Sequence, residues 1–200
     1  MTAVVDKPKV TPEDLLKLPK DRRYELVDGE LVEKQMATQS VVVAGELFVH
    51  LHQYARKHNL GLVLPTDASY CCFPDEPDKV RKPDLSFVRR ERITPQFWTP
   101  GHIRIAPDLV VEVVSPNDEV NEVDKRVLDY QRAGVPLLWV VHPASRHVDV
   151  YRLSGRGEIL GEQHELTGEP VLPGFRLPVR EIFRPLELIP VPEVKTGGQT

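Results

Sequence analysis

The chain has 200 residues, with 26 Lys and Arg against 30 Asp and Glu, a formal net charge of -4 and 40% hydrophobic residues. This balance is typical of one soluble globular domain and excludes a disordered chain. No apolar run approaches the ~20 residues that span a bilayer, and residues 1–10 lack the apolar stretch of a secretory signal, so we expect a cytoplasmic protein.

Cysteine and proline usage adds two predictions. Cys71 and Cys72 are adjacent, so a disulfide between them would need a strained ring, and we interpret them as reduced thiols in a strand. None of the 19 prolines falls within residues 20–64 or 117–135. Because proline disrupts helix interiors, these two windows are predicted to hold the helices.

The N-terminal region predicts a short helix followed by a hairpin. The Thr11 hydroxyl can cap a helix that starts with proline and acidic residues and ends near Pro19. In residues 24–33, YELVDGELVE, two alternating apolar runs flank Asp28 and Gly29. Asp-Gly is a preferred pair for a tight hairpin turn because both central residues need positive φ.

The middle of the chain predicts one long helix and several strands. From Ser40, apolar residues recur at three- and four-residue intervals, which predicts a helix that buries one face and ends at Gly61. Glu112 interrupts an apolar run that is typical of a central strand covered on both faces. The predicted β-rich segments are residues 60–65, 68–73, 84–88 and 108–114.

A second helix and a buried strand follow. Ser115 begins a helix-start pattern, and Gly134 can close the helix. Residues 137–141, LLWVV, predict the next buried strand, so strand, helix and strand form a βαβ-like unit. The architecture predicted is α/β, with a mixed central sheet flanked by helices. The expected buried face of the second helix comprises Val120, Val123, Val127 and Gln131.

The C-terminal part predicts a turn and a docked end. Gly155 and Gly157 indicate a turn, and Phe175 and Phe183 are expected to dock on the sheet. The domain organisation expected is a flexible arm over residues 1–10, one domain over residues 11–185 and a disordered tail over residues 186–200.

Two carboxylates stand out because their neighbours are apolar. Asp84 begins one predicted strand and Glu112 interrupts another. A carboxylate in such a place costs several kcal/mol unless it meets a cation or hydrogen-bond donors. One interpretation is a buried ion pair with an arginine; the other is a divalent metal site, since carboxylates from neighbouring strands suit magnesium. The spacing alone leaves both open.

Four separated motifs follow one another along the chain. They are YELVDGE at residues 24–30, VRKPDLSFV at 80–88, PDLVVEVVSP at 107–116, and Tyr130 with AGV at 133–135 leading to WVV at 139–141. In this order they resemble the Uma-two-like family of restriction-endonuclease-like proteins, a branch of the PD-(D/E)XK nuclease superfamily. The resemblance covers about residues 11–183, nearly the whole chain. It implies a restriction-endonuclease-like fold and a metal-dependent endonuclease that hydrolyses DNA.

The resemblance also implies roles for individual residues. Asp84 and Glu112 would be the metal carboxylates, for Mg²⁺ with Mn²⁺ as a substitute, and Glu25 a third acidic residue near them. Val114 stands where the superfamily has a catalytic lysine. In this branch a lysine on the following helix replaces it, and the matching position here is Arg126, with Lys125 one residue earlier. Because adjacent helical residues differ by ~100° in direction, the two are not interchangeable, and the family register favours Arg126.

Positive charge is concentrated near Asp84. Residues 79–92 carry six basic and two acidic residues, a net of +4. Neutralisation of phosphates by such residues is what a DNA groove requires, although a charged run is also typical of a solvated face. A homodimer would join two basic edges and so offset the acidic total of the chain. The DNA-binding residues predicted are Arg81, Lys82, Arg89 and Arg90.

Other functions have weaker support. The same fold could serve as a DNA-associated or regulatory homodimer with an impaired site, an alternative favoured by arginine at position 126. An inverting glycosidase using Glu112 and Asp84 ranks last because the chain has only two tryptophans to bind sugars. His50 and His52 point in different directions on one helix, and His142 and His147 flank a turn without identified partners, so no zinc site is predicted.

Overall fold

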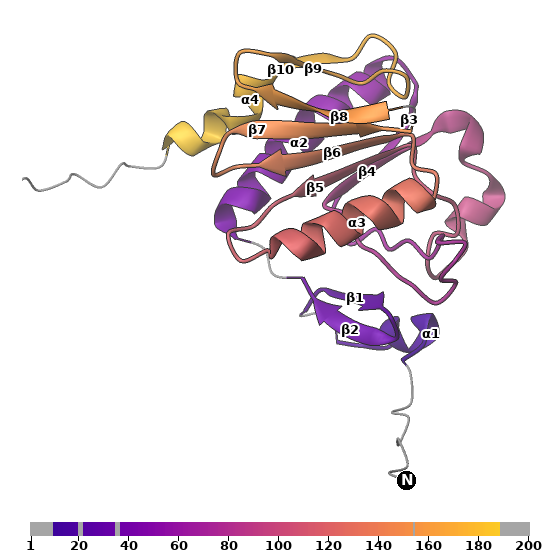
Figure 1. Ribbon diagram of the computed structural model, residues 1–200. Helices are drawn as coiled ribbons and strands as arrows, with labels where there is room; N and C mark the ends of the chain where they lie inside the picture. The colour runs from indigo at the N-terminus through magenta and orange to yellow at the C-terminus, as the bar shows by residue number, and fades with distance from the viewer. Residues whose placement is uncertain (1–9, 20–21, 35–36, 154, 189–200) are drawn as a thin grey trace, which may run out of the picture.

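The computed structural model describes residues 10–188 except 20–21, 35–36 and 154 (Figure 1). Three short 3-10 helices, η1 (Arg90–Arg92), η2 (Pro95–Trp98) and η3 (Arg184–Leu188), accompany the main elements. The main elements in chain order are α1 (Pro12–Leu15), β1 (Tyr24–Val27), β2 (Glu30–Glu33), α2 (Thr38–Lys57), β3 (Gly61–Leu64), β4 (Leu85–Arg89), β5 (Leu109–Val113), α3 (Val120–Arg132), β6 (Leu137–His142), β7 (His147–Arg152), β8 (Gly155–Gly161), β9 (Glu165–Thr167), β10 (Arg176–Pro178) and α4 (Val179–Phe183).

A mixed sheet forms the centre of the fold. In the described part of the chain its six strands have the order β3-β4-β5-β6-β7-β8, and β5 and β6 are its one parallel pair of neighbours. The crossover between them is α3, as the βαβ pattern predicts. The prediction of an α/β fold with a mixed central sheet flanked by helices is therefore confirmed.

Helices cover both faces of the sheet (Figure 1). On one face, α2 and the C-terminal elements form the larger core, in which Phe175 and Phe183 are buried as predicted. On the other face, α3 covers a smaller core. Because side chains alternate along a strand, the polar Glu112 shares the α3 face with Val110 of the same strand. The smaller core comprises Phe73, Val110, Val127, Tyr130, Val135, Leu138 and Val140.

The β1–β2 hairpin lies beside the sheet, next to α1 (Figure 1). Asp28 and Gly29 have φ of 54° and 79°, which confirms the predicted turn. The backbone of Leu26 pairs with that of Val80, so the hairpin is attached to the segment that leads into β4. This pairing places the β1–β2 hairpin next to Asp84 and Glu112, the two carboxylates that the sequence predicts to form the site.

Helix boundaries depart from the prediction in three places, one of which is the start of α3 at Val120 and not at Ser115. The helix α1 ends at Leu15 and not near Pro19. The helix α2 ends at Lys57, and Asn59 with φ of 54° turns the chain, so Gly61 is not the terminator. Gly61 instead begins β3, where a Cβ would lie 2.1 Å from the Val88 carbonyl oxygen.

Four further expectations are corrected. Gly155 and Gly157 lie in the edge strand β8 and not in a turn. Residues 68–73 form isolated bridges at Tyr70, which pairs with Arg81 and Ile103, so the free thiols Cys71 and Cys72 are not in a strand.

The η3 helix extends to Leu188, so the expected tail does not begin at residue 186, while residues 1–9 and 189–200 lie outside the described part. On α3, Val120 is exposed, and the buried residues are Arg126, Val127, Asp129 and Tyr130.

Among the described residues, no helix combines the length and the apolar character needed to cross a membrane.

Candidate active site

Asp84 and Glu112 lie on neighbouring antiparallel strands. Asp84 immediately precedes β4, and its backbone N–H donates to the Val111 carbonyl of β5 at 3.1 Å. Its carboxylate oxygen Oδ2 accepts from the Val113 amide at 2.8 Å, which fixes the side chain against β5. Glu112 projects from β5 toward α3. Both residues are buried, with exposed fractions of 1% and 2%.

Lys34 joins the two carboxylates. It follows β2, and its Nζ lies 3.0 Å from Asp84 Oδ1 and 2.6 Å from Glu112 Oε2. The lysine side chain is itself only 4% exposed. One oxygen of each carboxylate therefore converges on a single cation. We call Lys34, Asp84 and Glu112 the Lys34 cluster.

The helix α3 completes the surroundings of Glu112. The Tyr130 hydroxyl donates to Glu112 Oε1 at 3.0 Å, and Arg126 Nη1 lies 3.7 Å from Glu112 Oε2. Arg126 also donates to Asp118 Oδ1 at 2.7 Å, while Asp118 Oδ2 accepts from the Ser115 amide. The loop between β5 and α3 thus holds Arg126 in place over the site.

The pKa directions of the two carboxyl groups diverge. Burial and the negative charge of Asp84 raise the pKa of Glu112, although Lys34 and Arg126 oppose the shift. Burial also acts to raise the pKa of Asp84, but Lys34, the Val113 amide and Arg23 outweigh it, so this pKa is lowered. The pKa of Lys34 is raised because Glu112 and Asp84 outweigh the effect of burial. Lys34 is therefore protonated at neutral pH.

A second buried ion network lies beside the first. Arg81 donates to Glu25 Oε2 at 2.8 Å and to Asp129 Oδ2 at 2.6 and 2.9 Å. Lys79 donates to the other oxygen of Asp129 at 2.6 Å, and the Lys82 amide donates to Glu25 Oε1 at 2.7 Å. We call Arg81, Glu25, Asp129 and Lys79 the Arg81 cluster. It ties the hairpin to α3 through the segment before β4.

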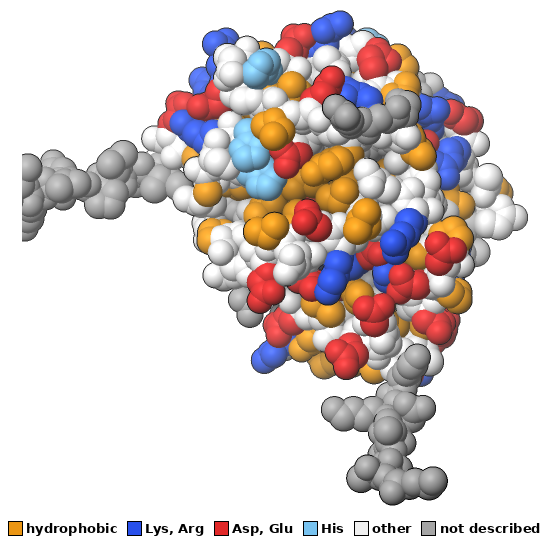
Figure 2. Space-filling view, viewed as in Figure 1, with side chains coloured by type: hydrophobic (Ala, Val, Ile, Leu, Met, Phe, Trp, Pro, Cys, Tyr) orange, Lys and Arg blue, Asp and Glu red, His pale blue; other side chains and the backbone are white. Residues whose placement is uncertain are grey.

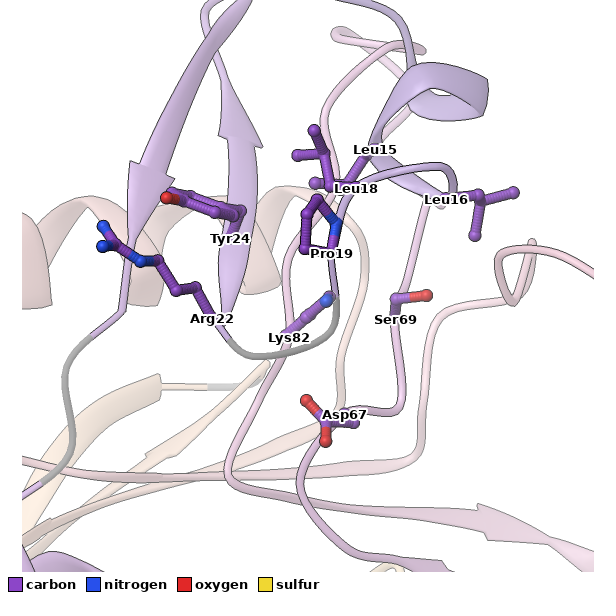
Figure 3. A pocket seen from close by; sticks show the side chains of 9 residues that line it. All are labelled: Leu15, Leu16, Leu18, Pro19, Arg22, Tyr24, Asp67, Ser69 and Lys82. Atoms are coloured by element: carbon purple, nitrogen blue, oxygen red, sulfur yellow. The ribbon is translucent and has the colours of Figure 1, made fainter.

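A cavity of about 330 Å³ has Arg22, Asp67 and Lys82 among its lining residues (Figure 3), and Arg23 connects it to Asp84. The Arg23 guanidinium links the two, because it lies 3.3 Å from Asp84 Oδ1 and 3.5 Å from Asp67 Oδ1 of the cavity wall. The side chains of Arg22 and Lys82 bring positive charge to the same wall. A polyanion could reach the neighbourhood of Asp84 from this side.

The comparisons with known proteins agree with this arrangement. The model of the Uma2 family, which carries the description "Putative restriction endonuclease", matches residues 12–180.

The chain belongs to the Uma2 family.

A crystal structure from Anabaena variabilis ATCC 29413, of "a putative nuclease belonging to DUF820", is similar to this Uma2-family chain with a TM-score of 0.73 and 22% sequence identity. The match covers 88% of this chain and 98% of that one, so it shows the fold over nearly the whole length. No curated protein matches the sequence. Family and fold together support a nuclease.

The structure separates the two cations predicted on α3. Arg126 reaches Glu112, as the family register favours. Lys125 does not reach the site: its side chain is 57% exposed and pairs with Glu122 at 2.7 Å. Glu25, in contrast, is buried at the edge of the site and not solvated on the hairpin, with its carboxylate committed to Arg81.

The predicted DNA-binding residues do not form one groove. The Arg81 side chain is 1% exposed, and both its partners are buried carboxylates, so it does not line the surface in this structure. Arg89 and Arg90 lie at the far end of β4, about 17 Å along the strand from Asp84. Arg89 there donates to the Pro170 carbonyl. Lys82 is the one predicted contact that lies beside the site.

Sequence reasoning missed Lys34 and gave Tyr130 no role. The burial of two carboxylates signals that a cation must compensate them, but it does not say which one. Lys34 is 78 residues from Glu112 in sequence and resembles any lysine at the end of a hairpin. Tyr130 stands out in the sequence only as a family landmark; its hydroxyl contact with Glu112 appears once α3 is packed on β5.

Proposed function

We propose that this protein is a metal-dependent endonuclease that hydrolyses phosphodiester bonds in DNA. The observation that carries the proposal is the convergence of Asp84 Oδ1 and Glu112 Oε2 on one buried cation, within 3.0 and 2.6 Å of Lys34 Nζ. Membership of a family described as restriction endonucleases supports DNA as the substrate.

The donor set fits Mg²⁺, with Mn²⁺ as a substitute. Asp84 and Glu112 offer hard carboxylate oxygens from two rigid, adjacent strands, the ligand type that these ions prefer. When bound, such an ion supplies a water of lowered pKa and offsets charge on the scissile phosphate. The Tyr130 hydroxyl keeps Glu112 oriented, and the Val113 amide does the same for Asp84.

We assign two cations to the stabilisation of negative charge in the transition state. Val114 occupies the position of the superfamily's catalytic lysine, and we assign the electrostatic role of that lysine to Lys34. The raised pKa of Lys34 keeps it charged. Lys34 lies at the point between the carboxylates where Asp84 and Glu112 would hold the ion, so metal binding would require its ammonium to move aside. Arg126, held by Asp118, stays over Glu112 as the second cation.

DNA would approach along the cavity wall that carries Arg22 and Lys82. If two copies paired through their basic edges, they would build a longer positive surface than one acidic chain offers, so we propose a homodimer. We propose that it acts in the cytoplasm. Light scattering at micromolar concentration should give twice the chain mass of 22.7 kDa. A mass of 22.7 kDa at that concentration would refute the dimer.

The test of the function combines metal binding with cleavage. Calorimetry should detect Mn²⁺ or Mg²⁺ binding to the wild type, and plasmid and oligonucleotide DNA should be cleaved only when the metal is present. Lys125→Ala, which changes a cation of the same helix outside the site, should bind and cleave as the wild type does. Metal binding without cleavage of either DNA would reject the enzyme.

A catalytically impaired DNA-binding or regulatory homodimer is the second candidate. One observation favours it: Lys34 already compensates both carboxylates, and all three side chains are at most 4% exposed. Such a protein would bind DNA in gel-shift experiments with the same affinity whether Mn²⁺ or EDTA is present, and would leave the DNA intact.

A further inference from the structure

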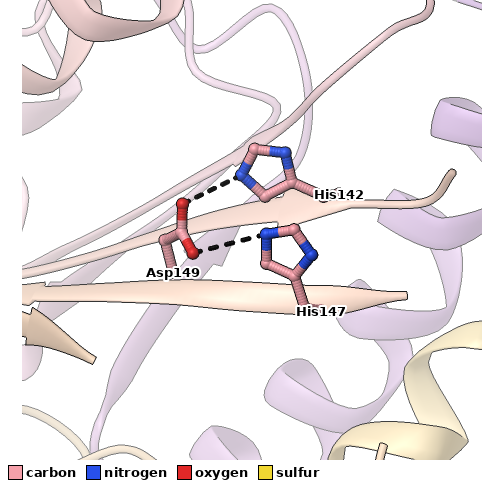
Figure 4. Close-up of side chains that lie close together, drawn as sticks. All are labelled: His142, His147 and Asp149. Carbon is pink, nitrogen blue, oxygen red and sulfur yellow. Dashed lines mark hydrogen bonds and ion pairs between the residues drawn. The ribbon is translucent and has the colours of Figure 1, made fainter. Parts of the chain in front are cut away.

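A cluster of two histidines and one aspartate lies on the sheet apart from the Lys34 cluster (Figure 4). His142 ends β6 and His147 begins β7, and the antiparallel register places them directly opposite each other. Asp149 follows two residues after His147, so its side chain emerges on the same face of the sheet. The sequence alone does not reveal partners for these histidines; the strand register supplies them.

Both imidazoles already lie close to the Asp149 carboxylate. His142 Nε2 lies 3.1 Å from Asp149 Oδ2, and His147 Nε2 lies 3.4 Å from Asp149 Oδ1. The three possible ligand atoms lie within 4.8 Å of one another. Neighbouring ligand atoms of a tetrahedral zinc ion with bonds of about 2.0–2.2 Å are about 3.3–3.6 Å apart, so the two nitrogen–oxygen distances are close to those of a coordination shell.

One oxygen of the cluster, Asp149 Oδ1, is buried and accepts no hydrogen bond from the residues that the structure describes, although His147 Nε2 lies 3.4 Å from it. A buried oxygen without a donor is costly, and a bound cation would remove that cost. The partner nearest to it is a histidine, whose neutral ring offers a metal ligand.

We propose that His142, His147 and Asp149 form a binding site for one divalent transition-metal ion of the zinc type. Two imidazoles and one carboxylate are the ligand set of mononuclear zinc and iron sites that keep an open position. The two rings now stack, with centroids 4.3 Å apart and planes 14° apart. Rotation of the rings about their side-chain bonds aims both nitrogens at one ion, while the paired strands hold the backbone in place.

The cluster is accessible to an ion from solution. The three side chains are 24%, 26% and 21% exposed. Figure 2 shows histidine side chains on the face that carries α3, next to hydrophobic ones. Ile159 of β8, which pairs with Asp149, is one of the exposed hydrophobic residues. The open coordination position would therefore face solvent within a partly apolar rim.

This site is separate from the carboxylates of the proposed nuclease. Glu112 pairs with Val140, and Val140 pairs with Asp149, so two strand spacings of about 4.8 Å each separate the backbones. Metal ions of a two-metal centre lie about 3.5–4 Å apart, which this spacing exceeds. The ligand types differ as well: imidazole favours zinc, and carboxylates alone favour magnesium.

The test is Zn²⁺ titration of the full-length, tag-free chain after EDTA treatment, with a chromophoric chelator as competitor. We expect one Zn²⁺ per chain that excess Mg²⁺ does not displace, and visible absorption bands when Co²⁺ replaces it. His147→Gln and Asp149→Asn should each lower the affinity by about a hundredfold or more, because even outer-shell partners of a metal account for about 10–100-fold.

Two variants serve as controls. His50 contacts the Glu46 carboxylate at 3.1 Å on α2, and among the described residues this pair has no second histidine. His50→Gln therefore removes an imidazole beside a carboxylate outside the proposed metal site. Neither His50→Gln nor Glu112→Gln should change the Zn²⁺ affinity or the Co²⁺ spectrum. Circular dichroism checks that each variant is folded, and His142→Gln replaces any that is not. Undiminished Zn²⁺ binding in the folded cluster variants, or no binding by the wild type below about 100 μM, would overturn the proposal.

Discussion

The Lys34 cluster and the Arg81 cluster both bury acidic and basic side chains together, yet the pKa values of their glutamates shift in opposite directions. In the Arg81 cluster each carboxylate oxygen has its own donor, and Arg81 and Lys34 lower the pKa of Glu25 against the effect of burial. In the Lys34 cluster the carboxylate oxygens also have donors, among them the Val113 amide and the Tyr130 hydroxyl, yet burial and the charge of Asp84 raise the pKa of Glu112. Burial of charge by itself therefore does not mark a functional site; what distinguishes the Lys34 cluster is the raised pKa of Glu112 beside a second carboxylate.

The largest effect should follow from breaking the Arg81 cluster. Arg81→Leu leaves Glu25 and Asp129 buried without their guanidinium, so we expect the free energy of unfolding to fall by about 3–5 kcal/mol. Urea denaturation followed by circular dichroism measures it. Saturating Mn²⁺ should not restore the loss, since this cluster has no metal role. A change smaller than that of the surface variant Lys17→Ala would contradict the structural role.

Lys34→Met should also destabilise the metal-free protein, by about 3 kcal/mol, because Asp84 and Glu112 are left together without their shared cation. Here Mn²⁺ should restore most of the stability, since a divalent ion can replace the ammonium between the carboxylates. Thermal unfolding with and without Mn²⁺ tests the contrast with Arg81→Leu. An identical response of the two variants to Mn²⁺ would mean that the two clusters do not differ as described.

The sequence predicted the parts of this contrast that depend on local pattern. The Asp28-Gly29 turn, the β5–α3–β6 unit and the anomaly of Glu112 follow from turn chemistry, helix caps and apolar neighbours. Ion partners do not follow, because Lys34 and Glu112 meet only after the hairpin docks beside β4. For the same reason Arg81, which the charge of its segment marked for DNA, is engaged by Glu25 and Asp129.

Glu112→Gln should lower Mn²⁺ affinity and DNA cleavage by about a hundredfold or more, since a direct ligand contributes at least as much as its outer-shell partners. The fold should be retained, because the amide has nearly the same shape and its oxygen can still accept from Tyr130. Calorimetry and a plasmid assay measure the two losses. Unchanged metal affinity in a folded Glu112→Gln protein would remove Glu112 from the site.

The smallest effect should come from the cations of α3. Arg126→Ala should reduce cleavage by about tenfold at saturating Mn²⁺, because it removes a charge 3.7 Å from Glu112 that no metal replaces. Lys125→Ala should have no effect, since its side chain points to solvent. Arg126→Lys, which restores the residue of the family pattern, should keep more activity than Arg126→Ala. Equal rates in all three variants would show that neither cation takes part.

The most direct measurement is anomalous diffraction from a crystal soaked in Mn²⁺. A single peak should lie within about 2.0–2.6 Å of both Asp84 Oδ1 and Glu112 Oε2, with the Lys34 side chain moved away from the space between them. Tyr130 and Arg126 should keep their contacts with Glu112. A crystal that shows Lys34 still bridging both carboxylates, and no Mn²⁺ there at millimolar concentration, would contradict the assignment of these two strands as a metal-dependent nuclease site.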